Sequence, residues 1–225
     1  MAARNDLEPK LYGYSRVACG ICTHVLCAGL TVLIATLAKP GSSLFSWHPF
    51  CMTLAFSFFM TQAILLFSPH SSPVKKFKHN NKVLLHRILQ VLCVVCAIVG
   101  IVTISNNKNQ NNKPHFTSWH GLIGLITVIS TVMQTMGSIG LFSLLSPKLP
   151  KGWSLAKLKR YHATSGLLTY LLGSVSLVLG LSTAWFSSNV SGYVWYLAAL
   201  CPIVCALVIM NQVTNAYMTK KRSQY

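Results

Sequence analysis

Six long apolar stretches, separated by short polar segments, constrain this 225-residue chain more than any other feature. A helix needs about 20 apolar residues to cross a bilayer, and only helices or closed barrels satisfy their backbone polar groups there. The stretches span residues 17–38, 44–67, 83–105, 117–145, 161–186 and 193–217, and the second could begin at His48 instead of Leu44. They predict an all-α protein, a six-helix transmembrane bundle.

The composition agrees with a membrane protein, because 52% of the residues are hydrophobic and only 9% are charged, against about a quarter charged in soluble domains. We expect one six-helix domain over residues 17–217, a polar tail over 1–16 and a basic tail over 218–225. Membrane lipid is therefore a partner. Nucleic acid is not expected despite a net charge of +17, because the basic residues lie in short loops and not on a soluble face.

The distribution of lysine and arginine predicts the orientation. Of the 19 basic residues, three face one side, namely Lys39, Lys108 and Lys113, and the others lie at the alternate ends of the stretches. Since positive charge is enriched in cytosolic loops, both termini are expected in the cytosol. The sequon at Asn189 then falls on the opposite side, although its loop is short for glycosylation.

Acidic residues are almost absent, and this excludes several functions. Asp6 and Glu8 are the only two, and both lie in the N-terminal tail. Carboxylate dyads, di-iron and calcium sites, a Ser-His-Asp triad and the carboxylate relays of proton pumps are therefore ruled out of the spans. The eight cysteines all lie in apolar stretches, where free cysteine behaves as a small hydrophobe.

Four histidines occupy four consecutive stretches, one in each. His48, His86, His120 and His162 lie at or just inside the end of an apolar run. An ionisable residue inside a membrane helix is costly and is a functional candidate. A single one is more often a packing residue, which is our expectation for His24, but four in this arrangement favour a shared site.

The predicted orientation pairs these histidines. His48 and His120 fall at the non-cytosolic side, and His86 and His162 at the cytosolic side. In an antiparallel four-helix bundle, spans two and four are diagonal partners, as are spans three and five, and such bundles hold cofactors between facing side chains. Two histidines without cysteine or carboxylate do not make a zinc site, but they match the axial ligands of a six-coordinate haem. The sequence thus predicts two b haems within a four-helix core.

Small residues share the faces of these histidines. They are Gly100, Gly121, Gly124, Gly166, Gly173 and Gly180. Glycine allows close approach of a macrocycle, and it equally allows close packing of membrane helices, so the pattern leaves both explanations open.

The histidine segments resemble a known family. Ser46-Trp47-His48-Pro49, Lys82-x-x-x-His86, Ser118-Trp119-His120 and Leu158-Lys159-Arg160-Tyr161-His162 are similar to the haem-ligand segments of the cytochrome b561 family of di-haem transmembrane reductases. The similarity covers nearly the whole chain, and is greatest to the short members of the family. The chain departs from vesicle members, whose Ala-Leu-Leu-Val-Tyr-Arg motif is Ala63-Ile-Leu-Leu-Phe67-Ser here, and whose Ser-Leu-His-Ser-Trp segment is replaced by Phe116-Thr-Ser-Trp-His120.

The resemblance implies a transmembrane ascorbate-dependent oxidoreductase. Electrons would pass from cytosolic ascorbate through two haem b groups to ferric iron chelates or monodehydroascorbate on the other side. We expect a multi-pass protein of an internal membrane, either the endoplasmic reticulum or a cytoplasmic vesicle, and a homodimer stays open.

Basic residues near the cytosolic histidines are candidates for the donor site. Ascorbate is a monoanion at neutral pH, and a dense positive field attracts it. Lys82 lies one turn before His86, Lys78 one turn earlier, and Arg160 just before His162. Each is equally explained as a positive-inside anchor, and Arg160 could instead pair with a haem propionate.

The remaining histidines divide between the two sides. His115 lies close to His120 in sequence and is a candidate for the acceptor site. His70 and His79 are expected in a cytosolic loop, exposed to solvent.

Two other functions stay open from the sequence alone. One is a haem-free transporter or channel in which the histidines form a polar path. The other is a haem subunit that passes electrons only to a partner protein.

Overall fold

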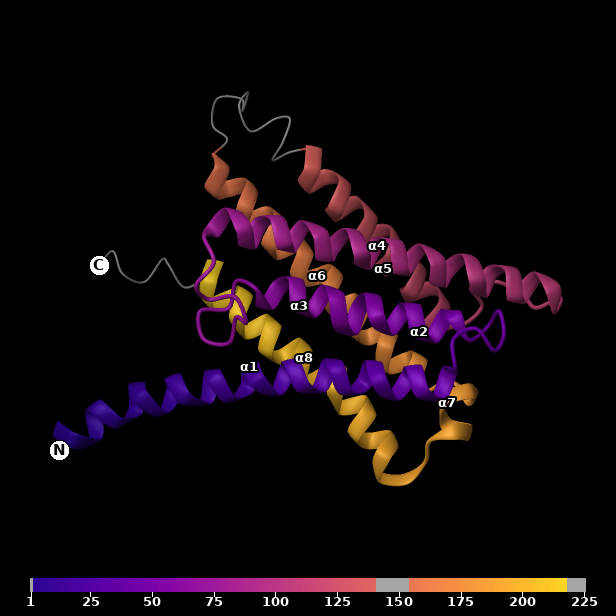
Figure 1. The fold of residues 1–225 in the computed structure, drawn as a ribbon, viewed down its shortest axis with the longest axis horizontal. Coiled ribbons are helices and arrows are strands. Elements are labelled where there is room, and N and C mark those ends of the chain that lie inside the picture. Colours follow the sequence, from indigo (N-terminus) through magenta and orange to yellow (C-terminus); the bar gives the residue numbers. More distant parts are fainter. Residues whose placement is uncertain (1, 141–153, 218–225) are drawn as a thin grey trace.

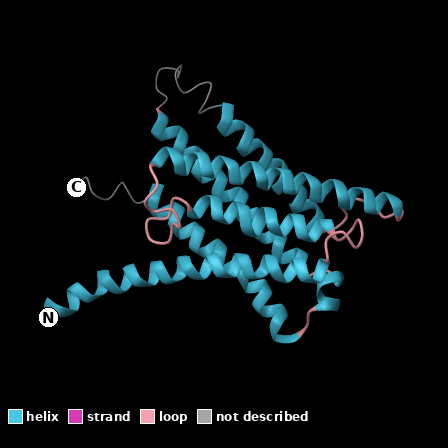
Figure 2. Ribbon diagram, viewed as in Figure 1, coloured by secondary structure: helices cyan, strands magenta, loops and turns pink. Residues whose placement is uncertain are grey.

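The computed structural model describes residues 2–140 and 154–217, and this part of the chain contains helices and loops without strands (Figures 1 and 2). The helices in chain order are α1 (Ala2–Ala38), α2 (Trp47–Thr53), the π-helical η1 (Leu54–Phe59), α3 (Met60–Leu65), α4 (His79–Gln110), α5 (Trp119–Ile139), α6 (Leu155–Leu181), α7 (Ala184–Asn189) and α8 (Gly192–Tyr217).

Six of these units are long and apolar enough to cross a membrane: α1, the continuous α2–η1–α3 unit, α4, α5, α6 and α8. This confirms the predicted six-helix, all-α architecture. The start of α1 and the end of α8 lie at the same end of the bundle as the starts of α4 and α6 (Figure 1). The N-terminal half of α1 projects beyond the other helices.

Several helices begin earlier than the hydropathy pattern predicts. Helix α4 begins at His79 instead of 83, and α6 begins at Leu155 instead of 161. The Ser154 side chain caps α6 by accepting a hydrogen bond of 3.2 Å from the amide of Lys157. Polar residues such as Lys and Arg are good helix formers, so a helix can extend past its apolar part. The expected polar tail over 1–16 is likewise helical, since α1 begins at Ala2.

The predicted fifth span ends earlier than expected, because α6 stops at Leu181 and the short α7 follows. Phe186 of α7 is fully buried and closes this end of the bundle. The expected end of the fourth span at residue 145 lies outside the described residues, as does the basic tail 218–225.

The π turn η1 sits in the middle of the second span. Its neighbour Thr61 places its hydroxyl 2.9 Å from the Tyr170 hydroxyl of α6, and both residues are buried. Phe56 of η1 packs with Tyr170 in the main core, together with residues such as Cys93 and Ala97 of α4. The middle of the bundle is therefore an apolar plug, which joins the second, third and fifth spans.

Polar side chains inside the bundle are satisfied by hydrogen bonds. Within the part of the chain that the structure describes, no buried side-chain nitrogen or oxygen lacks a partner. Thr127 and Thr131 of α5, for example, donate to carbonyls one turn earlier, at 2.8 Å each. This satisfaction within a single helix is what a lipid-embedded bundle requires.

Candidate functional site

The four histidines predicted from the sequence meet in two pairs across the bundle. The ring centroids of His48 (α2) and His120 (α5) are 6.1 Å apart, with the ring planes at 78°. Those of His86 (α4) and His162 (α6) are 6.2 Å apart, at 84°. The pairs are those expected from the diagonal positions of the spans.

The two pairs occupy opposite ends of the bundle. His48 and His120 are the second residues of α2 and α5, which begin at the same end. His86 and His162 are each the eighth residue of their helices, about two turns from the helix start. The sequence predicted that His86 and His162 lie at the starts of their helices. Because α4 and α6 begin earlier than predicted, both residues lie further along their helices.

Backbone carbonyls orient three of the four rings. Nδ1 lies 2.9 Å from the Gly100 carbonyl oxygen in His48, 3.0 Å from that of Ala63 in His86, and 3.0 Å from that of Ser176 in His120. A carbonyl oxygen can only accept, so Nδ1 carries the hydrogen and Nε2 keeps its lone pair. This is how proteins prepare a histidine to bind a metal through Nε2.

The spacing of the rings suits one metal atom between each pair. Two collinear metal–nitrogen bonds of about 2.0–2.1 Å, with about 1.1 Å from nitrogen to ring centre, give a centroid separation of about 6.2–6.4 Å. The observed 6.1 and 6.2 Å are close to the lower end of this range. Rings that share a metal axis can rotate about it, so ring planes near a right angle are compatible with such a site.

Each of the two positions is formed by two histidines of the described residues. Among residues 2–140 and 154–217, no group of three or more His, Cys, Asp or Glu side chains could hold a metal ion. A zinc or di-metal site needs more protein ligands. A haem iron needs two, because the porphyrin supplies four nitrogens in its plane. The donor set therefore fits haem.

The glycines near the histidines serve different purposes. A Cβ on Gly180 of α6 would lie 3.1 Å from Cε1 of His120, so this glycine makes room for the ring. Around Gly166, one turn after His162, there is open space. A Cβ on Gly173 would lie 3.3 Å from Cδ1 of Phe56. This glycine therefore allows close packing of helices and does not make room for a histidine ring.

The predicted donor-site residues lie on the helices of the His86–His162 pair. Lys82 is half-buried one turn before His86, Lys78 directly precedes α4, and Arg160 is exposed two residues before His162. The structure places all three cations at the same end of the bundle as the His86–His162 pair.

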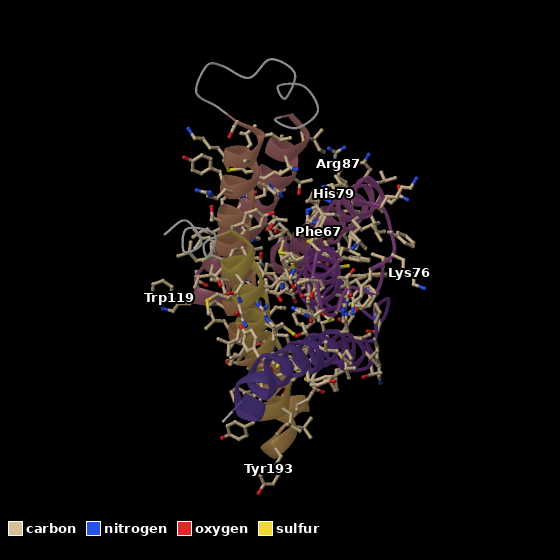
Figure 3. All side chains as sticks on the ribbon, turned by 90° about the vertical axis from the view of Figure 1, so that its left-hand side faces the viewer. Phe67, Lys76, His79, Arg87, Trp119 and Tyr193 are labelled. Carbon is tan, nitrogen blue, oxygen red and sulfur yellow. The ribbon has the colours of Figure 1, made fainter. Side chains whose placement is uncertain are left out.

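Sequence reasoning missed other residues at this end. The Phe67 ring lies 5.5 Å from His86 and 6.1 Å from His79, and the charge of Arg87 is within electrostatic range of His86. Figure 3 labels Phe67 and His79 beside each other, in agreement with the 6.1 Å between their ring centroids, and Arg87 lies about two turns further along α4. The early start of α4 makes His79 a helical residue that packs on Phe67, although it stays exposed as expected. The sequence did contain a hint of Phe67, because this residue lies in the segment Ala63-Ile-Leu-Leu-Phe67-Ser, where the chain differs from the vesicle members of the family.

At the other end, His115 is exposed and lies 2.7 Å from the Asn109 side-chain oxygen. It belongs to the loop after α4, and the structure gives no contact between it and the His120 ring. Lys108 donates to the Pro114 carbonyl at 2.8 Å and is within electrostatic range of both His48 and His120. The sequence had placed Lys108 on this side without assigning it to the site.

Comparisons with known proteins agree with this geometry. A family model described as eukaryotic cytochrome b561 matches residues 47–187, which include all four histidines. The chain is 48% identical over 224 residues to "Transmembrane reductase CYB561D2" of Homo sapiens and 49% identical to that of Mus musculus, over the full length of both chains in each case. It is 37% identical to "Probable transmembrane reductase CYB561D1" of Homo sapiens, covering 96% of this chain and 93% of that protein.

Proposed function

Since the chain belongs to the eukaryotic cytochrome b561 family of transmembrane reductases, we propose that it moves electrons across the membrane through two b haems. His48 and His120 hold one haem, and His86 and His162 hold the other. The observation that carries this proposal is the presence of two histidine pairs, one at each end of the bundle, with centroids 6.1 and 6.2 Å apart.

His48, His120, His86 and His162 would hold the haems, which would supply one-electron chemistry at the two ends of the bundle. The protein's part is to orient those ligands and keep water away from them. The carbonyls of Gly100, Ala63 and Ser176 fix three rings and raise their basicity as ligands. The apolar plug around Phe56 and Tyr170 separates the two ends with packed side chains.

Ascorbate is the proposed donor, at the His86–His162 end, which we assign to the cytosol. The only acids of the chain, Asp6 and Glu8, lie near the start of α1, so no carboxylate of α2 to α8 competes for the lysines and arginines there. Lys82, Lys78 and Arg160 would bind the anion, and the exposed Phe67 edge would lie beside the His86 ring. Steering of an anion by such a field speeds its encounter with the site.

At the opposite end, the proposed acceptors are ferric chelates or monodehydroascorbate. Both are anionic in common forms, and the cations at this end include Lys108, whose charge reaches the His48–His120 pair. His115, in the same loop, would help to bind them. The proposed location is an internal membrane, with both termini in the cytosol.

A reduced-minus-oxidised spectrum of the purified protein, with ascorbate as reductant, tests this function. We expect a reducible Soret band and a sharp b-type α band. The absence of any reducible Soret band would favour a haem-free transporter. Liposomes that contain the protein and trapped ferricyanide then separate a complete reductase from an electron-passing subunit, since only the former reduces ferricyanide with external ascorbate and no partner.

A further inference from the structure

Helix α1 contacts the loop that leads to His86. His24, expected from the sequence to be an isolated structural residue, is half-buried and bonded at both ring nitrogens. Nδ1 lies 2.8 Å from the Gln62 side-chain oxygen on α3, and Nε2 lies 3.0 Å from the Ser71 carbonyl oxygen in the loop between α3 and α4. One side chain thus ties α1 to both a helix of the core and the loop after it.

Gly20 lies one turn before His24 and faces the same loop. It is buried, and a Cβ built on it would overlap the Cβ and Oγ of Ser71. The loop therefore rests directly on the backbone of α1, at a position that only glycine allows. Gly29, further along α1, is exposed, and a Cβ there would have no neighbour within 4 Å.

The segment 66–72 is a turn held by its own hydrogen bonds, and it follows directly on α3. Contact of the turn with α1 therefore also fixes the end of α3. The Ser72 hydroxyl donates to the Leu66 carbonyl at 2.7 Å, and the Ser71 amide donates to the Ser68 hydroxyl at 3.2 Å. The turn begins with Leu66 and Phe67, directly at the end of α3. Movement of Ser71 would consequently move the last turn of α3.

The last turn of α3 supplies the hydrogen-bond acceptor for His86. The Phe67 amide, which would bond Ala63 if the helix continued, donates to the Ile64 carbonyl instead, at 3.2 Å. The Ala63 carbonyl is left for Nδ1 of His86, at 3.0 Å. Carbonyls at a helix end lack an intrahelical partner, so the acceptor exists because α3 ends where the docked turn begins.

We propose that His24 is a positioning residue for the redox centre at the His86–His162 end. With Gly20 it docks the turn 66–72 on α1, and this docking holds the Ala63 carbonyl and the Phe67 ring against His86. The effect on a haem rests on the proposed function, whereas the docking of the turn does not. Helix α1 is then part of the site's framework.

Two glycine variants of α1 test the docking with a matched control. Gly20→Ala adds one methyl group where Ser71 lies, and Gly29→Ala adds the same group where nothing lies. The double variant Gly20→Ala/Ser71→Gly restores the room. His24→Ala removes both hydrogen bonds without adding bulk.

The first readout is independent of haem. Trypsin cleavage after Lys76, an exposed residue of the same loop (Figure 3), is followed by mass spectrometry on the intact chain in detergent. We expect severalfold faster cleavage in Gly20→Ala and His24→Ala, the normal rate in Gly29→Ala, and recovery in the double variant. Equal rates in all four variants would overturn the docking.

The second readout is the electron paramagnetic resonance of the oxidised haems. His86→Ala and His120→Ala identify which low-spin signal belongs to which end. We expect Gly20→Ala and His24→Ala to shift the signal of the His86–His162 end alone. A loosened loop with both signals unchanged would overturn the positioning role. Failure of the wild-type chain to bind haem would instead remove the proposed function, while the trypsin result would still decide the docking.

Discussion

The carbonyl partners of the histidines differ from one residue to the next. The Ala63 carbonyl, in the last turn of α3, accepts from His86, whereas the Gly100 carbonyl that accepts from His48 also accepts from the Thr103 hydroxyl at 3.1 Å. A helix end also carries negative partial charge, which strengthens a hydrogen bond from the ring. The two ends of the bundle therefore offer their ligands unequal environments, and two bound haems should be spectroscopically distinct.

Replacing Lys82 by Ala should slow reduction by ascorbate about tenfold or more, because steering of an anion contributes on this scale. Arg160→Ala should act in the same direction. Reduction by dithionite should stay normal, since both haems remain bound. Stopped-flow absorbance measures both rates.

Lys113→Ala is the matched control, because it removes the same charge from the opposite end. Its ascorbate rate should equal that of the wild type. If Lys82→Ala also reacts at the wild-type rate, with unchanged dependence on ionic strength, the donor binds elsewhere and Lys82 serves topology alone.

At the scale of elements, the sequence predicted which spans exist but not where their helices begin. Hydropathy marks the part of a helix that meets lipid, and it misses polar turns such as those at the starts of α4 and α6. The pairing of the histidines followed from span order, since diagonal positions in a bundle are fixed by short loops. The carbonyl partners could not be predicted, because they depend on helix rotation and on the π turn η1, which no residue pattern announces.

Gly180→Leu should displace the His120 ring, because even a Cβ at this position of α6 lies 3.1 Å from it. Overpacking of this kind forces neighbouring side chains out of place. We expect the variant to lose the haem of the His48–His120 pair and to keep the other, so that haem content falls by about half. Gly137→Leu on α5, where a Cβ has no neighbour within 4 Å, should keep both. Equal haem content in the two variants would exclude close contact between α6 and the His120 ring.

For the whole molecule, an apolar core separates two histidine pairs, one at each end of the bundle. The start of α1 and the end of α8 lie at the His86–His162 end (Figure 1). If the positive-inside rule holds for this chain, ascorbate reaches that end from the cytosol. The orientation itself stays a prediction from the sequence, and the fold adds only that the start of α1 and the end of α8 share one end.

Trypsin added to sealed vesicles with the cytosolic face outward tests this orientation. It should cleave after Lys76 and after Lys220, and should leave the bond after Lys108 intact until detergent is added. The physical reason is that the bilayer shields the loops on the inner side. Cleavage after Lys108 in sealed vesicles, with Lys76 protected, would invert the scheme and exchange the donor and acceptor ends.

Haem content per chain in paired histidine variants tests the central claim most directly. Pyridine haemochrome absorbance divided by protein concentration should give two haems for the wild type and one for His48→Ala, His120→Ala or His86→Ala. Because His48 and His120 share one site, their double variant should still bind one haem, whereas His48→Ala/His86→Ala should bind none. Two haems in His86→Ala, or one haem in His48→Ala/His86→Ala, would contradict the assignment of the two sites.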